Sequence, residues 1–401
     1  MPTQSFADLG VSDAVTSALA RRRITQPFAI QRLVIGDILA GRDVLAKSPT
    51  GSGKTLAFAI PLADRIAAGG PRPAALVLAP TRELASQIRD ESRSVAHARA
   101  LKIAAVYGGV GIANQAREAS KAHILVATPG RLEDLLERRT FSLAHLRFLV
   151  VDEGDRMLDM GFRPVVDRIV GRCPANRQTM FFSATLDGEA GRVAREYTRD
   201  AVRREHSPTT HAKAAIEHRF VSVERADRVG ALVEELRGER DLALVFVRTK
   251  RGADRLVKRL RSAGVTANAI HGDKAQGQRE KTLASFESGR VNVLVATDVA
   301  ARGIHVAGIS HVINFDPPED PDGYIHRVGR TARAGQTGIG ITFVGPEQAH
   351  GVRHIAGQLK LHAEFEQSGL GSRRASTGPH RKPAGGHSRR RNSRRASRRA
   401  D

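Results

Sequence analysis

The chain has 401 residues, of which 41% are hydrophobic and 26% charged, and its net charge is +22 at pH 7. This length suits two domains of ordinary size, and the lack of an 18-residue apolar run or a signal peptide predicts a cytoplasmic protein without a membrane segment. The single cysteine, Cys173, excludes an intramolecular disulfide framework and a multi-cysteine zinc site.

The first motif in chain order is a candidate phosphate loop at residues 48–55, Ser-Pro-Thr-Gly-Ser-Gly-Lys-Thr. It follows a strand-like run, and its glycines allow a tight turn that aims backbone N–H groups at a polyphosphate. Lys54 can reach the β- and γ-phosphate oxygens, and the Thr55 hydroxyl can bind Mg²⁺. Ser48 stands where the usual pattern has a glycine. The expected nucleotide contacts are Thr50, Gly51, Ser52, Gly53, Lys54 and Thr55.

Short apolar runs recur with helix-like segments between them, which indicates parallel sheets wrapped by helices. The first set occupies residues 43–46, 75–78, 103–106, 124–127, 148–151 and 179–182. The second set occupies residues 243–246, 267–270, 293–296, 311–314 and 340–343. The fold class is therefore α/β with two tandem domains. We place these at 1–205 and 216–367, with a linker at 206–215.

A second acidic motif, Asp152-Glu153-Gly154-Asp155, follows the strand-like run at 148–151, where ligands of open α/β sheets gather. Mg²⁺ bound to a nucleotide needs a carboxylate at such a place. We expect Asp152 to hold the metal largely through water and Glu153 to polarise the attacking water. Taken alone, an acidic cluster after a strand is as often a helix cap, but with the phosphate loop it indicates a metal–nucleotide site.

The second half of the chain has no phosphate loop. It carries Arg330 and Arg333 instead, on a His- and Arg-rich segment that starts at Tyr324. An ATP site between two domains explains this division, because the second domain would supply cations to the γ-phosphate. An isolated Arg-x-x-Arg is more often a surface ion-pair element, so this interpretation depends on the other motifs.

Positive charge is densest at the end of the chain. Residues 372–401 contain ten Arg and one Lys against one acid, a net +10, so the other 371 residues carry +12. These Ser-Arg-Arg repeats lack aliphatic core residues, so we expect a disordered basic tail over 368–401. Its expected ligand is a phosphate backbone, bound in a salt-dependent way; the alternative is a solvated tail without a binding role.

The order of these motifs resembles that of the DEAD-box family of superfamily 2 RNA helicases, from Phe6 to about Val344, and the Ala- and Arg-rich composition favours a bacterial member. In the first half the matching elements are Phe6 with Gln31, 48–55, 80–84, 108–109, 128–131, 152–155 and 183–185. In the second half they are 245–249, Gln276 with Arg279, 296–303 and 326–333.

The resemblance implies two RecA-like domains that hydrolyse ATP with Mg²⁺ and remodel RNA. It implies that Gln31 reads adenine and that Asp298, Arg330 and Arg333 complete the nucleotide site. The residues it implies for coupling are Asp155, Ser183, Thr185 and His326. The residues it implies for RNA are Thr81, Arg82, Gly109, Thr128, Gly130, Arg131, Arg248, Gly272 and Thr297, with Asp273 as a further candidate. Such hydroxyls, amides and guanidinium groups suit phosphates, so binding should be sequence-independent.

Three positions depart from the family pattern. Gly154 replaces an alanine, which should loosen the backbone but leave the chemistry intact. His305 replaces an aspartate that contacts the nucleotide sugar, and Ile24 replaces an aromatic residue that stacks on adenine. Base affinity should therefore depend more on Gln31 than on stacking.

Alternatives to an unwinding enzyme remain at this level. One is an ATP-gated RNA clamp or annealing scaffold, which the basic tail favours. Another is a nucleic-acid-binding protein whose ATP site has decayed, against which the intact Lys54, Glu153 and Arg330 argue. A DNA helicase of the same superfamily is a third. We expect a monomer whose tail can recruit ribosomal or RNA-decay proteins.

Overall fold

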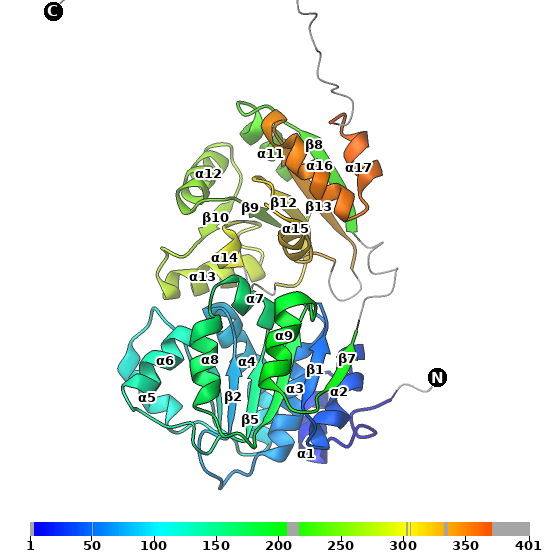
Figure 1. Ribbon diagram of the computed structural model, residues 1–401. Coiled ribbons are helices and arrows are strands. Elements are labelled where there is room, and N and C mark those ends of the chain that lie inside the picture. Colours follow the sequence, from blue (N-terminus) through cyan, green and yellow to red (C-terminus); the bar gives the residue numbers. More distant parts are fainter. Residues whose placement is uncertain are drawn as a thin grey trace, which may run out of the picture.

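The computed structural model describes residues 4–49, 51–206, 216–301, 304, 306–332 and 336–370. The expectations for Thr50, His305 and Arg333, and for nearly all of the linker and basic tail, concern residues outside these ranges. Within them the chain forms two α/β domains, drawn one above the other in Figure 1. A bilayer-spanning helix is not found among the described residues.

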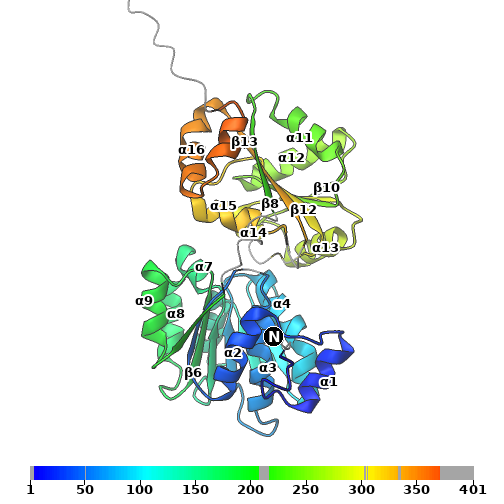
Figure 2. The ribbon, with the colours of Figure 1, turned by 90° about the vertical axis from the view of Figure 1, so that its right-hand side faces the viewer.

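The first domain is built on a parallel sheet of seven strands in the order β3-β4-β2-β5-β6-β1-β7. Its strands are β1 (Val44–Lys47), β2 (Ala75–Leu78), β3 (Ile103–Val106), β4 (Ile124–Ala127), β5 (Phe148–Val151), β6 (Gln178–Ser183) and β7 (Val202–Glu205). Its helices are α1 (Asp13–Arg21), α2 (Ala29–Leu39), α3 (Lys54–Arg65), α4 (Arg82–Ala98), α5 (Ile112–Ala119), α6 (Pro129–Glu137), α7 (Gly154–Asp159), α8 (Arg163–Gly171) and α9 (Gly188–Tyr197). They cover both faces of the sheet (Figures 1 and 2).

The second domain repeats this plan with six parallel strands in the order β10-β11-β9-β12-β13-β8. Its strands are β8 (Ile216–Ser222), β9 (Leu242–Phe246), β10 (Ala267–Ile270), β11 (Val293–Ala296), β12 (Ile309–Asn314) and β13 (Gly338–Val344). Its helices are α11 (Arg228–Arg237), α12 (Lys250–Ser262), α13 (Gln276–Glu287), α14 (Asp298–Ala301), α15 (Pro321–Val328), η1 (Pro346–Gln348), α16 (Ala349–Gln358) and α17 (His362–Gln367).

The central strands are apolar on both faces because helices cover both faces of each sheet. In β5, Phe148 and Val150 pack into one hydrophobic cluster, and Leu149 and Val151 pack into the cluster on the other side. This alternation follows from the two-residue period of a strand. It explains why a short run of four apolar residues was a sufficient signal for a strand here.

The predicted fold class is confirmed, and every predicted apolar run coincides with a strand. The sequence analysis missed two strands, β7 and β8, which lie at the edges of their sheets. In β7, Arg203 and Glu205 are exposed and alternate with half-buried residues. An edge strand of this kind lacks the continuous apolar run that identified the central strands.

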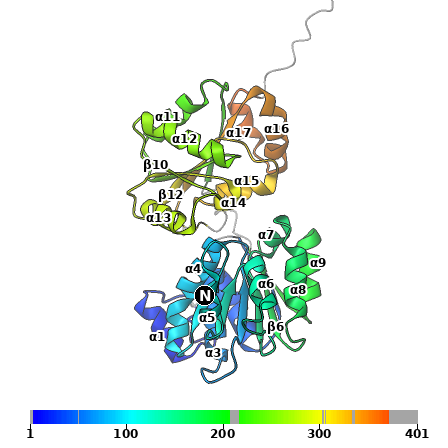
Figure 3. The same cartoon turned by 90° about the vertical axis from the view of Figure 1, so that its left-hand side faces the viewer.

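The carboxyl ends of the first sheet's strands face the second domain. All three views place α4 beneath α13 and α7 beneath α14 (Figures 1, 2 and 3). An ion pair between Glu83 of α4 and Arg279 of α13 confirms the first of these proximities. The loops that follow the strands, which carry most of the predicted site residues, therefore lie beside the domain interface.

Candidate functional site

The phosphate loop connects β1 to α3 in a conformation that its glycines make possible. Gly51 and Gly53 have φ of +83° and +88°, in the left-handed region where other residues are strained. Lys54 begins α3 and is buried, and its Nζ donates to the carbonyl of Ser48 over 3.2 Å. The lysine thus folds back across the loop, where a polyphosphate would replace that carbonyl as its partner.

The side chain of Ser48 makes a hydrogen bond that a glycine at this position could not make. Its hydroxyl donates to Oγ of Ser52 over 2.6 Å, and Ser52 Oγ donates to the carbonyl of Pro49 over 2.8 Å. The backbone N–H of Ser48 also donates to the carbonyl of Ser183 over 2.9 Å. The departure at Ser48 therefore ties the two sides of the loop together.

Gln31 connects the N-terminal helices to the phosphate loop. Its Oε1 accepts from the backbone N–H of Phe28 and its Nε2 donates to the carbonyl of Gly53, both over 2.9 Å. Each amide atom keeps one more hydrogen-bonding position, which a base can use. Phe28 itself is 57% exposed, and a Cβ on Gly53 would lie 2.5 Å from its ring. The sequence analysis missed this exposed aromatic ring beside the loop.

Buried carboxylates follow β5. Asp152, Glu153 and Asp155 are 2%, 4% and 8% exposed. Burial raises the pKa of the Asp152 carboxyl to about 7; the Lys54 ammonium opposes this rise and Glu153 adds to it. Among the described residues, Glu153 Oε2 is buried without a hydrogen-bond partner. A buried acid of raised pKa beside an unpartnered carboxylate oxygen fits a divalent cation.

Thr55 lies in the first turn of α3 and is also buried. Burial raises the pKa of the Glu91 carboxyl, and the Thr55 hydroxyl opposes this rise. A hydroxyl that donates to a carboxylate keeps its oxygen lone pairs for another partner. The arrangement is therefore compatible with the predicted metal contact at Thr55.

Gly154 has a packing role that the sequence did not indicate. A Cβ at this position would lie 2.1 Å from Cζ of Phe181, 2.4 Å from Cε1 and 2.9 Å from Cε2. Phe181 is a fully buried residue of β6. Its ring thus occupies the space of the alanine methyl group that the resemblance led us to expect.

Asp155 joins the acidic motif to the loop after β6. Its Oδ2 accepts from the backbone N–H groups of Ala184 and Thr185, both over 3.1 Å. The N–H of Thr185 also lies 3.3 Å from Oγ of Ser183, which is completely buried. The structure therefore brings together three of the four residues expected to couple the site to RNA.

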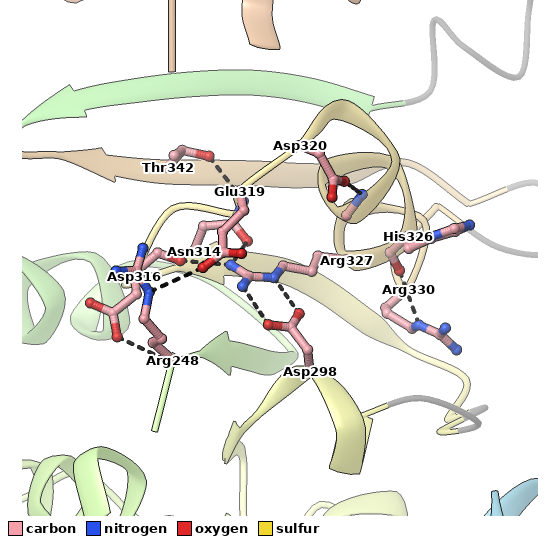
Figure 4. A network of polar contacts seen from close by, with 11 residues as sticks. Arg248, Asp298, Asn314, Asp316, Glu319, Asp320, His326, Arg327, Arg330 and Thr342 are labelled. Atoms are coloured by element: carbon pink, nitrogen blue, oxygen red, sulfur yellow. Dashed lines mark hydrogen bonds and ion pairs between the residues drawn. The ribbon is translucent and has the colours of Figure 1, made fainter. Parts of the chain in front are cut away.

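In the second domain, Arg327 is the centre of a polar network at the carboxyl ends of the strands (Figure 4). Its Nε and Nη2 donate to the two carboxylate oxygens of Asp298, each over 2.6 Å, and its Nη1 donates to Asn314 over 3.2 Å and to the Asp316 carbonyl over 2.6 Å. Asp298, which we expected at the nucleotide, has its carboxylate engaged by Arg327. The sequence analysis did not single out Arg327; its place next to His326 in the matched motif was the available signal.

Arg330 lies at the domain interface and is 2% exposed. Its Nη1 donates to the carbonyl of Ile304 over 3.1 Å and its Nε to that of His326 over 3.2 Å. Arg330 lines a cavity of about 410 Å³. The other lining residues include Arg248, Asp298, His326 and Arg327 of the second domain and Arg156 and Asp159 of α7 in the first domain. Arg330 and His326 therefore share a cavity with the helix that starts in the acidic motif.

The ion pair between the domains is buried on both sides. Nη2 of Arg279 lies 2.8 Å from Oε1 of Glu83, and the two side chains are 7% and 5% exposed. Burial raises the pKa of Glu83 and lowers that of Arg279, in both cases against the attraction of the partner. No donor is aligned with Oε1, and Nε of Arg279 is buried without a hydrogen-bond partner in the described chain. Desolvation thus outweighs attraction in both pKa shifts, and loss of either partner would leave a buried charge unpaired.

The residues expected to contact RNA lie at the carboxyl ends of neighbouring strands. In the first domain they follow β2, β3 and β4, and in the second they follow β9, β10 and β11. Gly109, at φ of +86°, makes room for the guanidinium of Arg82: a Cβ there would lie 2.0 Å from its Nη1. Arg131 donates to the carbonyl of Val110 over 3.1 Å. The nucleotide motifs follow β1 and β5, in the other half of the first sheet.

The remaining RNA candidates have varied surroundings. Thr81 caps α4 by accepting from the N–H of Leu84 over 3.2 Å, and Thr128 precedes α6, which contains Gly130. Arg248 donates its backbone N–H to Asp316 over 2.8 Å, and Asp273 forms an ion pair with Lys250 at 2.6 Å. Gly272 packs near the Lys250 side chain, and Thr297 precedes α14.

Comparisons with known proteins agree with this arrangement. Residues 28–193 match the DEAD/DEAH box helicase family and residues 227–335 match the helicase conserved C-terminal domain. A DEAD box protein from the hyperthermophile Methanococcus jannaschii is 36% identical, with 89% of this chain and 97% of that chain covered and a TM-score of 0.53. The chain therefore belongs to the DEAD-box family of superfamily 2 helicases.

Two further solved structures have a more similar domain arrangement. S. cerevisiae Dbp5 bound to RNA and ADP BeF3 is 29% identical over 90% of this chain and 94% of that chain, with a TM-score of 0.79. Mss116p bound to ssRNA and AMP-PNP is 27% identical over 88% and 77%, also with a TM-score of 0.79. Both scores exceed that of the Methanococcus protein despite lower identity. The two domains of this chain are thus placed much as in those nucleotide- and RNA-bound structures.

Proposed function

We propose that this protein is an RNA-dependent ATPase that couples ATP binding and hydrolysis to local remodelling of RNA duplexes. One observation carries the proposal: buried carboxylates lie beside a phosphate loop, and the helix that starts among them, α7, shares a cavity with a buried arginine of the other domain. Dbp5 and Mss116p, whose domain placement is similar, were solved with RNA and a nucleotide. Neither half of the site is complete without the other, so turnover requires the domains to meet.

The first domain binds the triphosphate and prepares water. Lys54 and the loop amides neutralise phosphate oxygens, and Glu153 accepts a proton from, or polarises, the attacking water. Asp152 and Thr55 would hold Mg²⁺, largely through water in the case of Asp152. When bound, the metal supplies charge neutralisation on the β- and γ-phosphates. Because burial raises the pKa of Asp152 to about 7, its carboxyl would release a proton on holding the cation.

The second domain supplies cations to the phosphate that is transferred. Arg330, and Arg333 outside the described residues, would stabilise charge that develops on the γ-phosphate. Arg327 holds Asp298 with two aligned hydrogen bonds, which fixes α14 and α15 relative to each other. Arg327 therefore keeps the end of α15, which precedes Arg330, in position and does not itself need to contact the nucleotide.

Base recognition would combine Gln31 with Phe28. Ile24 packs against the core of the first domain, whereas the Phe28 ring is exposed beside Gly53 and its N–H is bonded to Gln31. An aromatic ring next to the amide that reads the base can stack on it. Phe28→Ala should raise the Kd for ADP about three- to tenfold, and Leu33→Ala, at another exposed apolar position of α2, should leave it unchanged.

Coupling to RNA follows from how weakly the domains are held. The buried Glu83–Arg279 pair gains little net free energy, so ATP and RNA together must supply most of the energy of closure. RNA would bind along the carboxyl ends of β2, β3 and β4 and of β9, β10 and β11. Asp155, through Ser183 and Thr185, would report the state of the nucleotide to this surface.

Measuring phosphate release with and without RNA tests the proposal. We expect RNA to stimulate hydrolysis. Glu153→Gln should lower turnover about 100-fold or more, while ATP and RNA binding persist. Glu137→Gln, an exposed acid of the same domain, is the matched control. Sustained turnover by Glu153→Gln would reject the assigned role of Glu153, and no turnover by the native chain would indicate a decayed site.

An ATP-gated RNA clamp or annealing scaffold is the second candidate, because residues 372–401 carry a net +10 in the sequence. Strand separation and annealing, measured side by side on the same duplex with and without this segment, distinguish the two. Removing it should weaken RNA binding more at low salt than at high salt. Equal slopes of log affinity against log salt would show that the segment does not bind the backbone.

A further inference from the structure

The first domain has an arginine-lined hollow at the amino-terminal ends of its strands, on the side remote from the second domain. The hollow has a volume of about 460 Å³ and lies where β1, β5 and β6 begin. The phosphate loop and the acidic motif follow the other ends of β1 and β5. Strands of four residues separate the two edges by about 10 Å. The hollow is therefore distinct from the nucleotide site, because the strands begin on the side of the first domain that is remote from the second domain (Figure 1).

Positive charge in the hollow exceeds negative charge. Five arginines line it, against two aspartates: Arg42, Arg65, Arg147, Arg177 and Arg199, with Asp43 and Asp200. Both oxygens of Asp43 accept backbone N–H groups, of Thr179 over 2.8 Å and of Arg199 over 2.7 Å. Within the described chain, only Arg42 has a carboxylate in contact, that of Asp37. Four guanidinium groups thus face the hollow without an acidic partner.

Two of these cations share one aromatic ring. The guanidinium carbons of Arg65 and Arg147 lie 5.0 and 5.3 Å from the ring centre of Phe148. The pKa of Arg65 is lowered first by burial and then by the positive charge of Arg147. Each guanidinium is attracted to the aromatic ring, and both side chains line the hollow.

A third cation has unused hydrogen-bonding capacity. Arg177 donates to the carbonyls of Pro174 over 3.0 Å and Tyr197 over 3.4 Å, but its Nε is buried without a partner in the part of the chain that the structure describes. Among the described residues, the guanidinium of Arg199 donates to one carbonyl, that of Ala175, over 3.3 Å. Each guanidinium has five N–H donors, so both side chains keep donors that an anion in the hollow can use.

We propose that this hollow binds a phosphate group. Guanidinium forks match the planar and tetrahedral oxygens of carboxylates and phosphates, and phosphate carries enough negative charge to offset several arginines at once. The volume admits more than one phosphate, so a pyrophosphate moiety or two adjacent phosphates of an RNA strand would fit. This site goes beyond the proposed ATPase function, because it shares no residue with the nucleotide site.

The test uses the full chain saturated with ADP, so that the phosphate loop is occupied. Inorganic pyrophosphate is titrated by calorimetry, and a fluorescein-labelled 12-nucleotide RNA is followed by anisotropy. The variant is Arg147→Gln with Arg199→Gln, two exposed positions whose loss leaves the core intact. The matched control is Arg21→Gln with Arg192→Gln, which removes the same charge from exposed positions on α1 and α9. Melting temperatures verify that both variants fold.

We expect pyrophosphate to bind in addition to ADP, and to bind at least tenfold more weakly to the hollow variant than to the native chain or the control. If instead only RNA affinity drops tenfold, with a shallower salt dependence than the control, the phosphate belongs to the RNA backbone. If both variants change equally, or neither probe distinguishes them, the site does not exist. Should ADP fail to bind, two pyrophosphate sites would appear, and the variant would still change only one.

Discussion

Each of the two domains is built on its own parallel sheet, and the strand ends at which the domains meet carry buried acids in the first domain and buried arginines in the second. In the first domain this edge holds the buried acids Asp152 and Glu153 and, on α4, Glu83. In the second it holds the buried bases Arg327 and Arg330 and, on α13, Arg279. Repeating one architecture with complementary charges divides a single site between two bodies. Under the proposed function, hydrolysis would depend on the relative position of the domains, which RNA would control.

The two edges also differ in how their charges are satisfied. Arg327 makes four hydrogen bonds within its own domain, whereas Glu153 Oε2 has none among the described residues. The basic edge is thus preorganised, and the acidic edge depends on a cation and on the opposite domain. We expect substitutions on the two edges to have different consequences, which the following variants test.

The largest effect should come from Arg330. Arg330→Ala removes a cation that we expect at the γ-phosphate, so kcat for RNA-stimulated hydrolysis should fall by about 100-fold or more. Affinity for ADP should change little, because ADP lacks this phosphate. Arg259→Ala, at an exposed position of α12 in the same domain, is the control. A parallel loss of melting temperature and kcat would mean that Arg330 acts only through its bonds to Ile304 and His326.

The carboxyl of Asp152 should lower the free energy of unfolding of the protein as pH rises. Its folded pKa of about 7 lies above the unfolded value near 3.8, so its stabilising contribution is present at low pH and is lost as pH rises to 7. Asp152→Asn should therefore raise the free energy of unfolding of the nucleotide-free protein, by about 1 to 3 kcal/mol more at pH 8 than at pH 5. Urea unfolding at both pH values measures this difference.

The second domain should show the opposite dependence of stability on pH, at His218. Burial lowers the pKa of this histidine, so protonation of the unfolded chain destabilises the fold as pH falls below about 6.5. His218→Asn therefore serves as the contrasting control in the same experiment. If Asp152→Asn gave equal gains at pH 5 and pH 8, the carboxylate would not be the destabilising group.

Position 154 should be intolerant of the alanine that the family resemblance led us to expect there. Gly154→Ala forces a methyl group into the ring of Phe181, and such overpacking costs about 1 to 3 kcal/mol. Hydrolysis should fall as well, since the backbone of Glu153 would move. Phe181→Leu in the same chain should restore both stability and activity. If Gly154→Ala alone were neutral, the ring would be free to shift, and the tight contact would carry no function.

The smallest effect concerns the contact between the domains. Glu83→Gln or Arg279→Gln leaves one buried charge unpaired and should weaken RNA-stimulated turnover through a higher KM for RNA. The double variant removes both charges, so we expect a coupling energy of about 1 to 2 kcal/mol in a double-mutant cycle. Additive losses would show that the pair does not form when RNA is bound.

Much of the architecture could be predicted from the chain alone. Both central sheets follow from short apolar runs, and the phosphate loop and acidic motif are local patterns that need no tertiary information. The roles of the site residues stay predictions, including those at Thr50, Arg333 and His305. What sequence could not indicate depends on contacts between distant positions: the ring of Phe181 beside Gly154, the bonds between Arg327 and Asp298, and the arginines that converge below β5.

Phe181 also limits which side chains position 154 can carry. The ring fills the space next to Gly154, whereas glycine at 154 leaves room for either a large or a small side chain at 181. The two positions therefore form one packing unit, and the effects of substitutions at 154 and 181 on stability should be non-additive.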